Sequence, residues 1–394
     1  MEGHDDRYAG VDREVDVLLV GGGVASVRCA RTLRRNGFAG SILLVGDEPV
    51  PPYNRPPLSK ELLRDDLPDE LVSAEGPAWY ARRSVELATG AAVTALDPAN
   101  GRATLGDGST VAFDRCLLAT GAEPRRLPVP GGGDAMLLRT LGDSRRIRAA
   151  AIAAGPRAPV VIVGGGFIGV EVGSGMAAMG LRPTIVEMSK LWGGSLGAEL
   201  DAWGLDRLAD AGVEVRAGAA VSRIEAGAAW IGEERLPAAF VVGGIGVRPR
   251  DGLAEAAGLD VSDGIAVDAD QRASHPRVWA AGDVARVAGR RVEHWHAARE
   301  QGERAALAML GLPVPGERAA WVFSEVGGVS IDVLGLPDAW DEERWSADRS
   351  ALAYLEGGEL VGMAVIGGAV STEGARAAVE RRASASALPE LGPW

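Results

Sequence analysis

The feature that most constrains this chain is a pattern of strand, glycine turn and helix that occurs twice. In the first copy, the apolar run 15–20 leads directly into glycines 21–23, and a helical pattern then continues to about residue 35. In the second copy, the apolar run 160–163 leads into the glycine-rich stretch 164–169. Short apolar runs joined to helices by such turns are typical of parallel βαβ units. We therefore expect an α/β fold with an internal repeat of two Rossmann-like dinucleotide-binding domains.

The glycines of these turns have separate physical roles. Gly21 permits the tight turn after the strand, and Gly23 lets the backbone approach a pyrophosphate that faces the amino end of the helix. In the first copy the third glycine of the motif is replaced by Ser26, which is small enough for fairly close packing of the helix. The second copy carries the complete motif, in the residues Gly164, Gly166, Phe167, Ile168 and Gly169.

Both copies end their second strand with acidic residues. The run 41–46 ends in Asp47-Glu48, and the run 184–186 ends in Glu187. A carboxylate at this point can accept hydrogen bonds from ribose hydroxyls, and Glu187 would repel the additional phosphate of NADPH. NADH is therefore favoured over NADPH, although Lys190 shortly after Glu187 leaves NADPH open as the alternative.

A proline-rich segment between the two copies ends in an unusual lysine. Prolines prevent an ordinary helix up to Pro57, and a helix can begin at residues 58–59, just before Lys60. The only other lysine is Lys190, so nearly all the basic charge is arginine. Taken alone, Lys60 fits an ordinary solvated residue on a surface helix. The flanking motifs favour a site that needs a compact, movable ammonium group.

Composition excludes several classes of function. The formal charge of −13 argues against broad binding of nucleic acid or anionic membranes. Cys29 and Cys116 are far apart in apolar contexts, which indicates neither a disulfide framework nor a redox dithiol. With four histidines we expect no metal site, and we expect His294 and His296 to flank Trp295 in a loop. The polar N-terminus and the lack of an apolar run of about 18 residues favour a cytoplasmic enzyme.

The rest of the chain gives a coarser pattern of elements. We expect disorder at residues 1–14, a helix-rich region to about Leu87, a hairpin turn at Asp107-Gly108 and a frayed tail from about Ser384. The expected further strands are 92–96, 102–105, 110–113, 115–121, 213–216, 240–249, 278–284, 350–355 and 360–365, and the expected further helices are 142–154 and 198–211.

Five further stretches carry a resemblance to a known family. The most specific is the run Pro52–Lys60, and the others are Ala119-Thr120-Gly121, Gly244–Pro249, Gly282-Asp283 and Glu293–Ala297. Together with the two glycine motifs, they resemble the NADH-dependent, FAD-containing ferredoxin reductases of the putidaredoxin, rubredoxin and aromatic-dioxygenase type. The resemblance covers about residues 14–320 well and the remainder loosely.

The resemblance implies a glutathione-reductase-like architecture. Its FAD-binding domain would consist of residues 1–120 and 247–320, its NAD-binding domain of residues 121–246, and a small α+β cap of residues 321–394. In the family, the matching positions that line the flavin nucleotide are Ala25, Asp47, Lys60, Val93, Arg139, Asp283 and Trp295. The motifs imply further cofactor contacts at Gly21, Gly23, Val24, Glu48, Arg55, Ala119, Thr120, Gly121, Gly244, Ile245, Gly246 and Gly282, and NADH contacts at Gly164, Gly166, Phe167, Ile168, Gly169 and Glu187.

The resemblance also implies a mechanism. Lys60 would lie by the flavin N5 and pair with Glu171, so these two are the expected catalytic residues. NADH would give a hydride to the flavin, and electrons would leave singly to a ferredoxin-type carrier that serves a P450 or Rieske oxygenase. Disulfide reductases and related peroxidases need a cysteine beside the flavin, and the segment after Pro57 has none. The protein would be a monomer or homodimer.

The acceptor is the least constrained part of this expectation. Arg55, Arg286, Arg290 and Arg291 could form a basic rim for an acidic ferredoxin, or they could be ordinary solvated arginines. Phe323 stands where the family commonly has a tryptophan. The alternatives are an FAD enzyme acting directly on a small molecule in a biosynthetic pathway, and an NADH-sensing scaffold similar to the apoptosis-inducing factors.

Overall fold

The computed structural model describes residues 11–65 and 67–394, and the chain divides into two compact units. Unit 1 contains the described residues up to Asn54 together with residues 68–123 and 248–317. Unit 2 contains residues 55–67, 124–247 and 318–394. The short segment 55–67, which includes Lys60, therefore groups with the second glycine motif and with the C-terminal region.

The core of unit 1 is a sheet of seven strands. Its order is β3-β2-β1-β6-β5-β4, and β18 pairs with β6 outside this path. The pairs of β1 with β2 and β6 are parallel, whereas β4, β5 and β6 form an antiparallel meander. The strands are β1 (Arg13–Val20), β2 (Ile42–Gly46), β3 (Val85–Thr89), β4 (Val93–Asp97), β5 (Arg102–Leu105), β6 (Thr110–Leu118) and β18 (Val278–Ala280).

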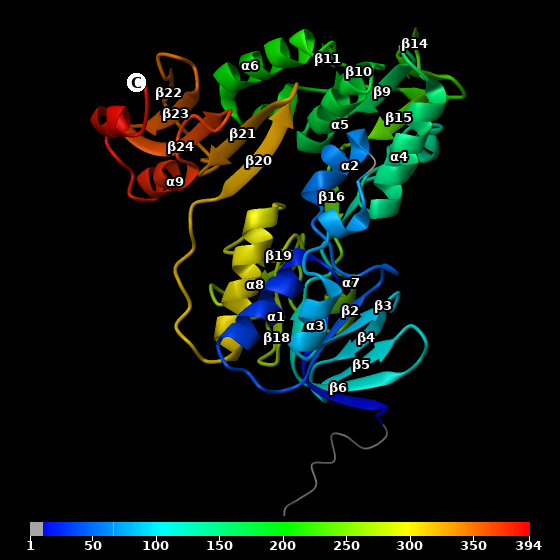
Figure 1. Ribbon diagram of the computed structural model, residues 1–394, viewed down its shortest axis with the longest axis vertical. Coiled ribbons are helices and arrows are strands. Elements are labelled where there is room, and N and C mark those ends of the chain that lie inside the picture. The colour runs from blue at the N-terminus through cyan, green and yellow to red at the C-terminus, as the bar shows by residue number, and fades with distance from the viewer. Residues whose placement is uncertain (1–10, 66) are drawn as a thin grey trace, which may run out of the picture. The chain divides into compact units, whose positions relative to one another are not determined.

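Strand β1 is buried on both sides because both faces of the sheet are covered. Val17 and Leu19 pack into one apolar cluster, and Leu18 and Val20 pack into another, as the two-residue period of a strand requires. The first cluster includes residues of α1 (Val24–Arg35) and α8 (Trp295–Met309), which lie side by side on that face (Figure 1).

The remaining elements of unit 1 are short. Strands β17 (Ile265–Val267) and β19 (Ala285–Val287) form a parallel pair, with helices α3 (Pro77–Arg82) and α7 (Gly252–Ala256) and the 3₁₀ turn η3 (Asp69–Leu71) elsewhere in the unit. The chain changes units near β7 (Ala122–Pro124) and β16 (Val247–Pro249), which pair with each other as a two-stranded sheet.

Unit 2 has its own parallel sheet, in the order β11-β10-β9-β15-β8. Its strands are β8 (Met136–Leu137), β9 (Pro159–Val163), β10 (Arg182–Glu187), β11 (Glu214–Ala217) and β15 (Phe240–Gly243). The associated helices are α2 (Glu61–Arg64), α4 (Leu141–Ala154), α5 (Phe167–Ala178) and α6 (Gly197–Asp210), with 3₁₀ turns η2 (Pro56–Ser59), η4 (Gly132–Asp134) and η5 (Leu191–Gly194). A meander of β12 (Arg223–Glu225), β13 (Ala228–Ile231) and β14 (Glu234–Pro237) completes this part.

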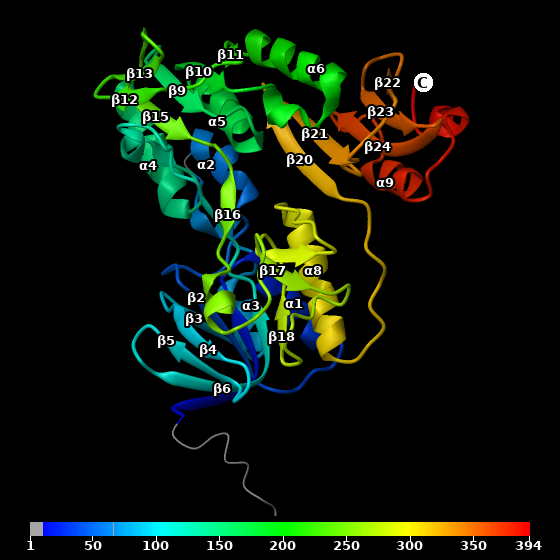
Figure 2. The ribbon, with the colours of Figure 1, turned by 180° about the vertical axis from the view of Figure 1, so that it is seen from behind.

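The C-terminal part of unit 2 is an antiparallel sheet with one covering helix (Figure 2). The strand order is β20-β21-β24-β23-β22, and α9 packs against β24 and β21. The bounds are β20 (Trp321–Val326), β21 (Val329–Leu334), β22 (Glu342–Trp345), β23 (Ala351–Glu356), β24 (Glu359–Ile366), α9 (Thr372–Glu380) and the 3₁₀ turn η6 (Ala385–Glu390).

Several local predictions were wrong. Arg13 and Glu14 belong to β1, while residues 1–10 lie outside the described part of the chain. The expected helix-rich region also contains strand β3, because residues 85–89 pair in parallel with β2. The expected strands 110–113 and 115–121 are largely one continuous strand, β6, that ends at Leu118. The expected frayed tail contains η6, whose Leu388 is buried in the C-terminal core.

Candidate functional site

The turn between β1 and α1 has the geometry that a pyrophosphate needs. Gly21 has a φ of +117°, and a Cβ atom there would lie 2.1 Å from the carbonyl oxygen of Ala119, so only glycine fits. Gly23 is the N-cap of α1 and no side chain caps the helix. The position of a Cβ on Gly23 has no atom within 4 Å. The amide groups at the start of α1 therefore remain accessible to an anion, which fits a dinucleotide.

Two other predicted cofactor segments of unit 1 border this turn. The amide of Ala119 donates to the carbonyl of Val20, which fixes the segment 119–121 beside the end of β1. Gly282, with a φ of +81°, lies next to Ala25, where an added Cβ would be 3.5 Å from the Ala25 side chain. Its amide donates to Oε1 of the buried Gln301 at 2.7 Å. Unit 1 thus brings together the predicted residues Gly21, Gly23, Val24, Ala25, Ala119, Thr120, Gly121, Gly282 and Asp283.

The two acidic residues after β2 are held by different partners. Asp47 forms an ion pair with Arg250, with 2.8 Å between Oδ2 and the guanidinium. Glu48 accepts a hydrogen bond from the Tyr53 hydroxyl at 2.6 Å. Arg250 itself is fixed by the cofactor segment, since its amide donates to Gly121 and its carbonyl accepts from the Thr120 hydroxyl. We did not predict a role for Arg250, although it directly follows the family-like stretch that ends at Pro249.

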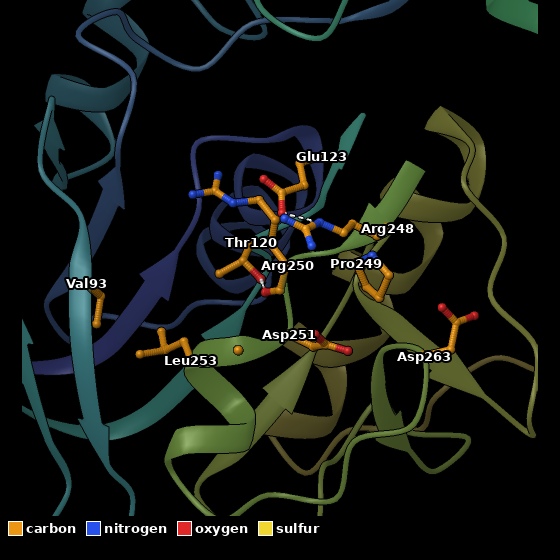
Figure 3. A pocket seen from close by; sticks show the side chains of 10 residues that line it. Val93, Thr120, Glu123, Arg248, Pro249, Arg250, Asp251, Leu253 and Asp263 are labelled. Atoms are coloured by element: carbon orange, nitrogen blue, oxygen red, sulfur yellow. Dashed lines mark hydrogen bonds and ion pairs between the residues drawn. The ribbon is translucent and has the colours of Figure 1, made fainter. Parts of the chain in front are cut away.

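A pocket of about 560 Å³ adjoins these residues in unit 1 (Figure 3). The predicted cofactor residues Val93 and Thr120 line it, and Leu253 adds an apolar side chain. The other lining residues are mostly charged, and they are Glu123, Arg248, Pro249, Arg250, Asp251, Gly252 and Asp263. An ion pair between Arg248 and Glu123, at 2.6 Å, closes one part of the wall.

Two sequence-based expectations for unit 1 need correction. Trp295 does not lie in a loop, because it is the first residue of α8 and its indole N–H donates to Asn54 at 3.0 Å. Arg291 does not belong to an open basic rim, because its side chain is only 10% exposed and pairs with Asp263 and Glu293. Asp263, which is distant in the sequence, and the nearby Glu293 together neutralise this arginine.

The second glycine motif, in unit 2, fits a dinucleotide equally well. Gly164 has a φ of +109°, and a Cβ there would lie 2.4 Å from the carbonyl oxygen of Gly244. A Cβ on Gly169 would lie 1.9 Å from the carbonyl oxygen of Gly164, so glycine allows α5 to pack this closely on β9. Gly166 is the N-cap of α5, again without a capping side chain. The predicted residues Phe167 and Ile168 open α5, and Ile168 is exposed. Ile245 and Gly246 follow Gly244 in the link to β16.

Glu187 lies at the end of β10 with its carboxylate held by the glycine turn. Its Oε2 accepts from the amide of Gly165 at 2.7 Å, and its Oε1 accepts from the amide of Ser189 at 2.8 Å. These bonds fix the carboxylate beside the motif, where a nucleotide ribose would be recognised.

The expected ion pair between Lys60 and Glu171 is present within unit 2. The Lys60 Nζ lies 2.7 Å from Glu171 Oε1, and the two side chains are 11% and 3% exposed. Lys60 follows η2 and precedes α2, so the proline-rich turn directs it toward α5, which carries Glu171. Lysine side chains are rarely buried, and a buried ammonium is tolerated only where an opposite charge and hydrogen bonds compensate it. Lys60 and Glu171 compensate each other in this way.

Three other residues complete the surroundings of this pair in unit 2. The hydroxyls of Ser59 and Ser324 both donate to Glu171, and the ring of Phe323 lies 5.6 Å from the Lys60 ammonium. The predicted residues Arg55 and Arg139 are also in contact, since the Arg55 guanidinium donates to the Arg139 carbonyl at 2.5 Å. We did not predict a role for either serine, although Ser59 stands within the stretch Pro52–Lys60 that carries the family resemblance.

The two cysteines are in the described part of the chain and both are fully buried. Burial in an apolar environment raises the pKa of each thiol far above its ordinary value, so both remain protonated at neutral pH. Neither has the properties of a thiol that exchanges electrons with a cofactor. No helix in the described residues has the length and apolar character needed to span a bilayer.

Comparisons with known proteins agree with this geometry. Residues 15–302 match the family model described as pyridine nucleotide-disulphide oxidoreductase. The chain belongs to this family. The biphenyl dioxygenase system ferredoxin–NAD(+) reductase component of Paraburkholderia xenovorans is 37% identical over 81% of this chain and 80% of its own length. Putidaredoxin reductase CamA of Pseudomonas putida is 33% identical over 83% of this chain and 81% of its own length.

Solved structures agree with membership of the pyridine nucleotide-disulphide oxidoreductase family. The crystal structure of the covalent putidaredoxin reductase–putidaredoxin complex matches with a TM-score of 0.88, 30% identity and coverage of 94% of both chains. The NADH:rubredoxin oxidoreductase of Clostridium acetobutylicum, at 20% identity and a TM-score of 0.75, shares the fold. The predictions of an α/β fold, of this family relationship and of an oxidoreductase are confirmed.

Proposed function

We propose that this protein takes a hydride from NADH onto FAD and passes electrons singly to a ferredoxin-type carrier that serves an oxygenase. The observation that carries the proposal is the buried Lys60–Glu171 pair, at 2.7 Å, beside a complete dinucleotide motif on the same helix α5. The names of the two relatives, a ferredoxin–NAD(+) reductase component and a putidaredoxin reductase, support the same activity.

FAD, when bound, supplies a hydride acceptor that can release its electrons one at a time. We assign its pyrophosphate to the amide groups at the start of α1 and its adenosine to the region of Asp47, Val93 and Thr120. Asp283 would accept from the ribityl chain. The pocket of unit 1 adjoins the adenosine end of this proposed site, since Val93 and Thr120 line it.

NADH would bind at the second motif, with its pyrophosphate at the start of α5 and its ribose at Glu187. The Glu187 carboxylate, already held by Gly165 and Ser189, is oriented to accept from a ribose hydroxyl and to repel a phosphate at that position. The Lys60 ammonium would stabilise negative charge on the reduced flavin ring, and Glu171 would hold that ammonium in place.

We keep two finer predictions as part of the proposal. The location would be the cytoplasm. The oligomeric state would be a monomer or a homodimer. Of the four arginines predicted to form a basic rim, Arg290 is exposed, and we assign docking of an acidic carrier to it.

An acceptor screen tests the proposal. Purified protein, NADH and each acceptor in turn (ferredoxins, cytochrome c, small organic acceptors and oxygen) are mixed, and NADH oxidation is followed. We expect a ferredoxin to be reduced with a far higher kcat/KM than the other acceptors. Charge reversal at Arg290 should raise the ferredoxin KM and leave ferricyanide reduction unchanged. Equal loss with both acceptors would contradict a docking role for this arginine.

The second candidate function is direct action on a small molecule. Phe323 favours it, because this residue lies against Lys60 where the family commonly has a tryptophan, and so the acceptor side of the site differs. Rapid NADH oxidation with a small organic acceptor and none with any ferredoxin would select this function. Slow turnover with NADH-dependent dimerisation would instead indicate a sensing scaffold.

A further inference from the structure

Glu171 accepts hydrogen bonds from three donors, which come from two separate parts of unit 2 outside its own helix. Its Oε1 accepts from the Lys60 ammonium at 2.7 Å and from the Ser324 hydroxyl at 2.7 Å. Its Oε2 accepts from the Ser59 hydroxyl. Ser59 and Lys60 belong to the proline-rich segment, Glu171 to α5 and Ser324 to β20. Both oxygens of the carboxylate are therefore fixed, and the whole group is excluded from water.

Strand β20 and the turn after it make two further contacts, one with α2 and one with α5. Glu325, which follows Ser324, forms an ion pair with Arg64 of α2. The amide of Gly327, in the turn directly after β20, donates to the Ser174 hydroxyl of α5 at 2.9 Å. Neighbouring residues of one C-terminal strand thus contact the helix that carries Glu171 and the helix that follows Lys60.

We propose that Ser59 and Ser324 are positioning residues for the reaction, which hold Glu171 in the one orientation that places the Lys60 ammonium. In this assignment, β20 of the C-terminal region is part of the active site as well as a cover for it. The inference rests on the proposed function, because it requires that the Lys60 ammonium assists hydride transfer to a flavin.

The two serines limit the rotation of the Glu171 carboxylate. A carboxylate that has one partner can turn about its terminal bond and still keep that partner, whereas a carboxylate held at both oxygens cannot. Among the residues that the structure describes, the Lys60 ammonium has one other hydrogen-bond acceptor, the Pro56 carbonyl at 3.4 Å, and this contact is weak. Its position is therefore set mainly by Glu171, and the position of Glu171 is set by the two serines.

Alanine replacements separate this role from packing, because Ser→Ala removes a hydroxyl and hardly changes volume. We expect Ser59→Ala and Ser324→Ala each to lower the limiting rate of flavin reduction by NADH about tenfold, since a hydrogen bond to a charged group is involved. The Kd for NADH should stay unchanged. Ser324→Thr, which keeps the hydroxyl in a strand, should restore most of the rate.

Ser174→Ala is the matched control. Ser174 is also buried on α5 and also contacts β20, but its hydroxyl donates to the Val170 carbonyl and does not reach Glu171. Its replacement should leave the rate of flavin reduction unchanged. A similar slowing in Ser174→Ala and Ser324→Ala would overturn the assignment, because it would trace both effects to the attachment of β20.

The decisive measurement is a stopped-flow comparison in two backgrounds. If Ser324 acts through Glu171, Ser324→Ala should have no further effect in a protein that already carries Glu171→Ala. The same tenfold loss in both backgrounds would overturn the inference. Lys60→Ala separates the role of the lysine from the role of the two serines. An unchanged rate in Lys60→Ala refutes the proposed role of the lysine itself, whereas slowing in Lys60→Ala with normal rates in both serine variants refutes only the role of the serines.

Discussion

Replacing the two charged residues of the buried pair, singly and together, should give strongly non-additive losses of stability. Removing one partner of a buried ion pair leaves an uncompensated charge and costs about 3–5 kcal/mol. In Lys60→Met, Glu171 keeps its two serine donors, so we expect the lower end, about 3 kcal/mol. In Glu171→Leu, the Lys60 ammonium keeps the weak hydrogen bond to Pro56 and the ring of Phe323, and neither carries a compensating charge, so we expect the upper end, about 5 kcal/mol.

The double variant Lys60→Met/Glu171→Leu contains no buried charge at this place. Apolar residues of similar volume often replace a buried pair without loss of stability, and the remaining cost is that of two serine hydroxyls without an acceptor, about 1–3 kcal/mol each. The double variant should therefore be less destabilised than the sum of the single variants by several kcal/mol. This difference is the coupling free energy between Lys60 and Glu171, which their 2.7 Å contact predicts to be large.

Urea denaturation of the FAD-loaded protein measures the effect. Flavin absorbance should follow unit 1, while tryptophan fluorescence should report mainly on unit 2, which holds most of the ten tryptophans. With a slope of about 2 kcal/mol per molar urea, a loss of 3 kcal/mol moves the midpoint of the unit 2 transition by about 1.5 M. Additive losses in the double variant would refute the reasoning, because they would show that the two side chains do not compensate each other's charge.

Three further predictions follow from other parts of the structure. Gly302→Ala should weaken retention of FAD, because the new Cβ would lie 2.2 Å from the Ala25 carbonyl oxygen and push α8 away from α1. Gly316→Ala is the control, since its Cβ would meet no atom within 4 Å and should have no effect. Equal FAD content in both variants would contradict this prediction. Glu187→Gln should raise the ratio of kcat/KM for NADPH to kcat/KM for NADH about tenfold, because it removes a charge that repels the additional phosphate of NADPH. Steady-state kinetics with both nucleotides measure this ratio, and an unchanged ratio would contradict the prediction. Cys29 and Cys116 should resist alkylation at pH 8 in the native protein, because burial raises the pKa of both thiols and only the thiolate reacts. Mass spectrometry of protein treated with iodoacetamide checks this, and both cysteines should be alkylated only when urea is present.

The glycine motifs were predictable because their causes are local. A positive φ at Gly21 and Gly164 and the close approach at Gly169 follow from the turn that joins a strand to a helix, so a short stretch of sequence specifies them. The same holds for α4, where Thr140 and Asp143 form a complete capping box at the expected start of the helix.

The contacts that complete the two sites could not be predicted, because they join residues that are distant in the sequence. Ser324 meets Glu171 across a separation of 153 residues, and Arg250 reaches Asp47 from beyond the whole of the second glycine motif. Neither partner carries a local pattern that indicates the other. The family resemblance pointed to Lys60 and Glu171 as a pair, but the hydroxyls around them became visible only in the folded chain.

Errors in the secondary structure have a similar origin. The run 85–89 has only a weak strand pattern, and its pairing with β2 decides its conformation. We expected Trp295 and its two flanking histidines to lie in a loop. The apolar face of α8, which buries Ala298, Ala305 and Met309 against α1, determines that this stretch is a helix.

The central claim, that a flavin bound by this chain accepts a hydride from NADH, is tested most directly by anaerobic titration of the purified protein. The account predicts a yellow protein with one FAD per chain, whose visible absorbance is bleached by a stoichiometric amount of NADH and restored by an oxidised ferredoxin. A colourless protein that takes up no FAD on reconstitution, or a bound flavin that NADH leaves oxidised, would contradict it.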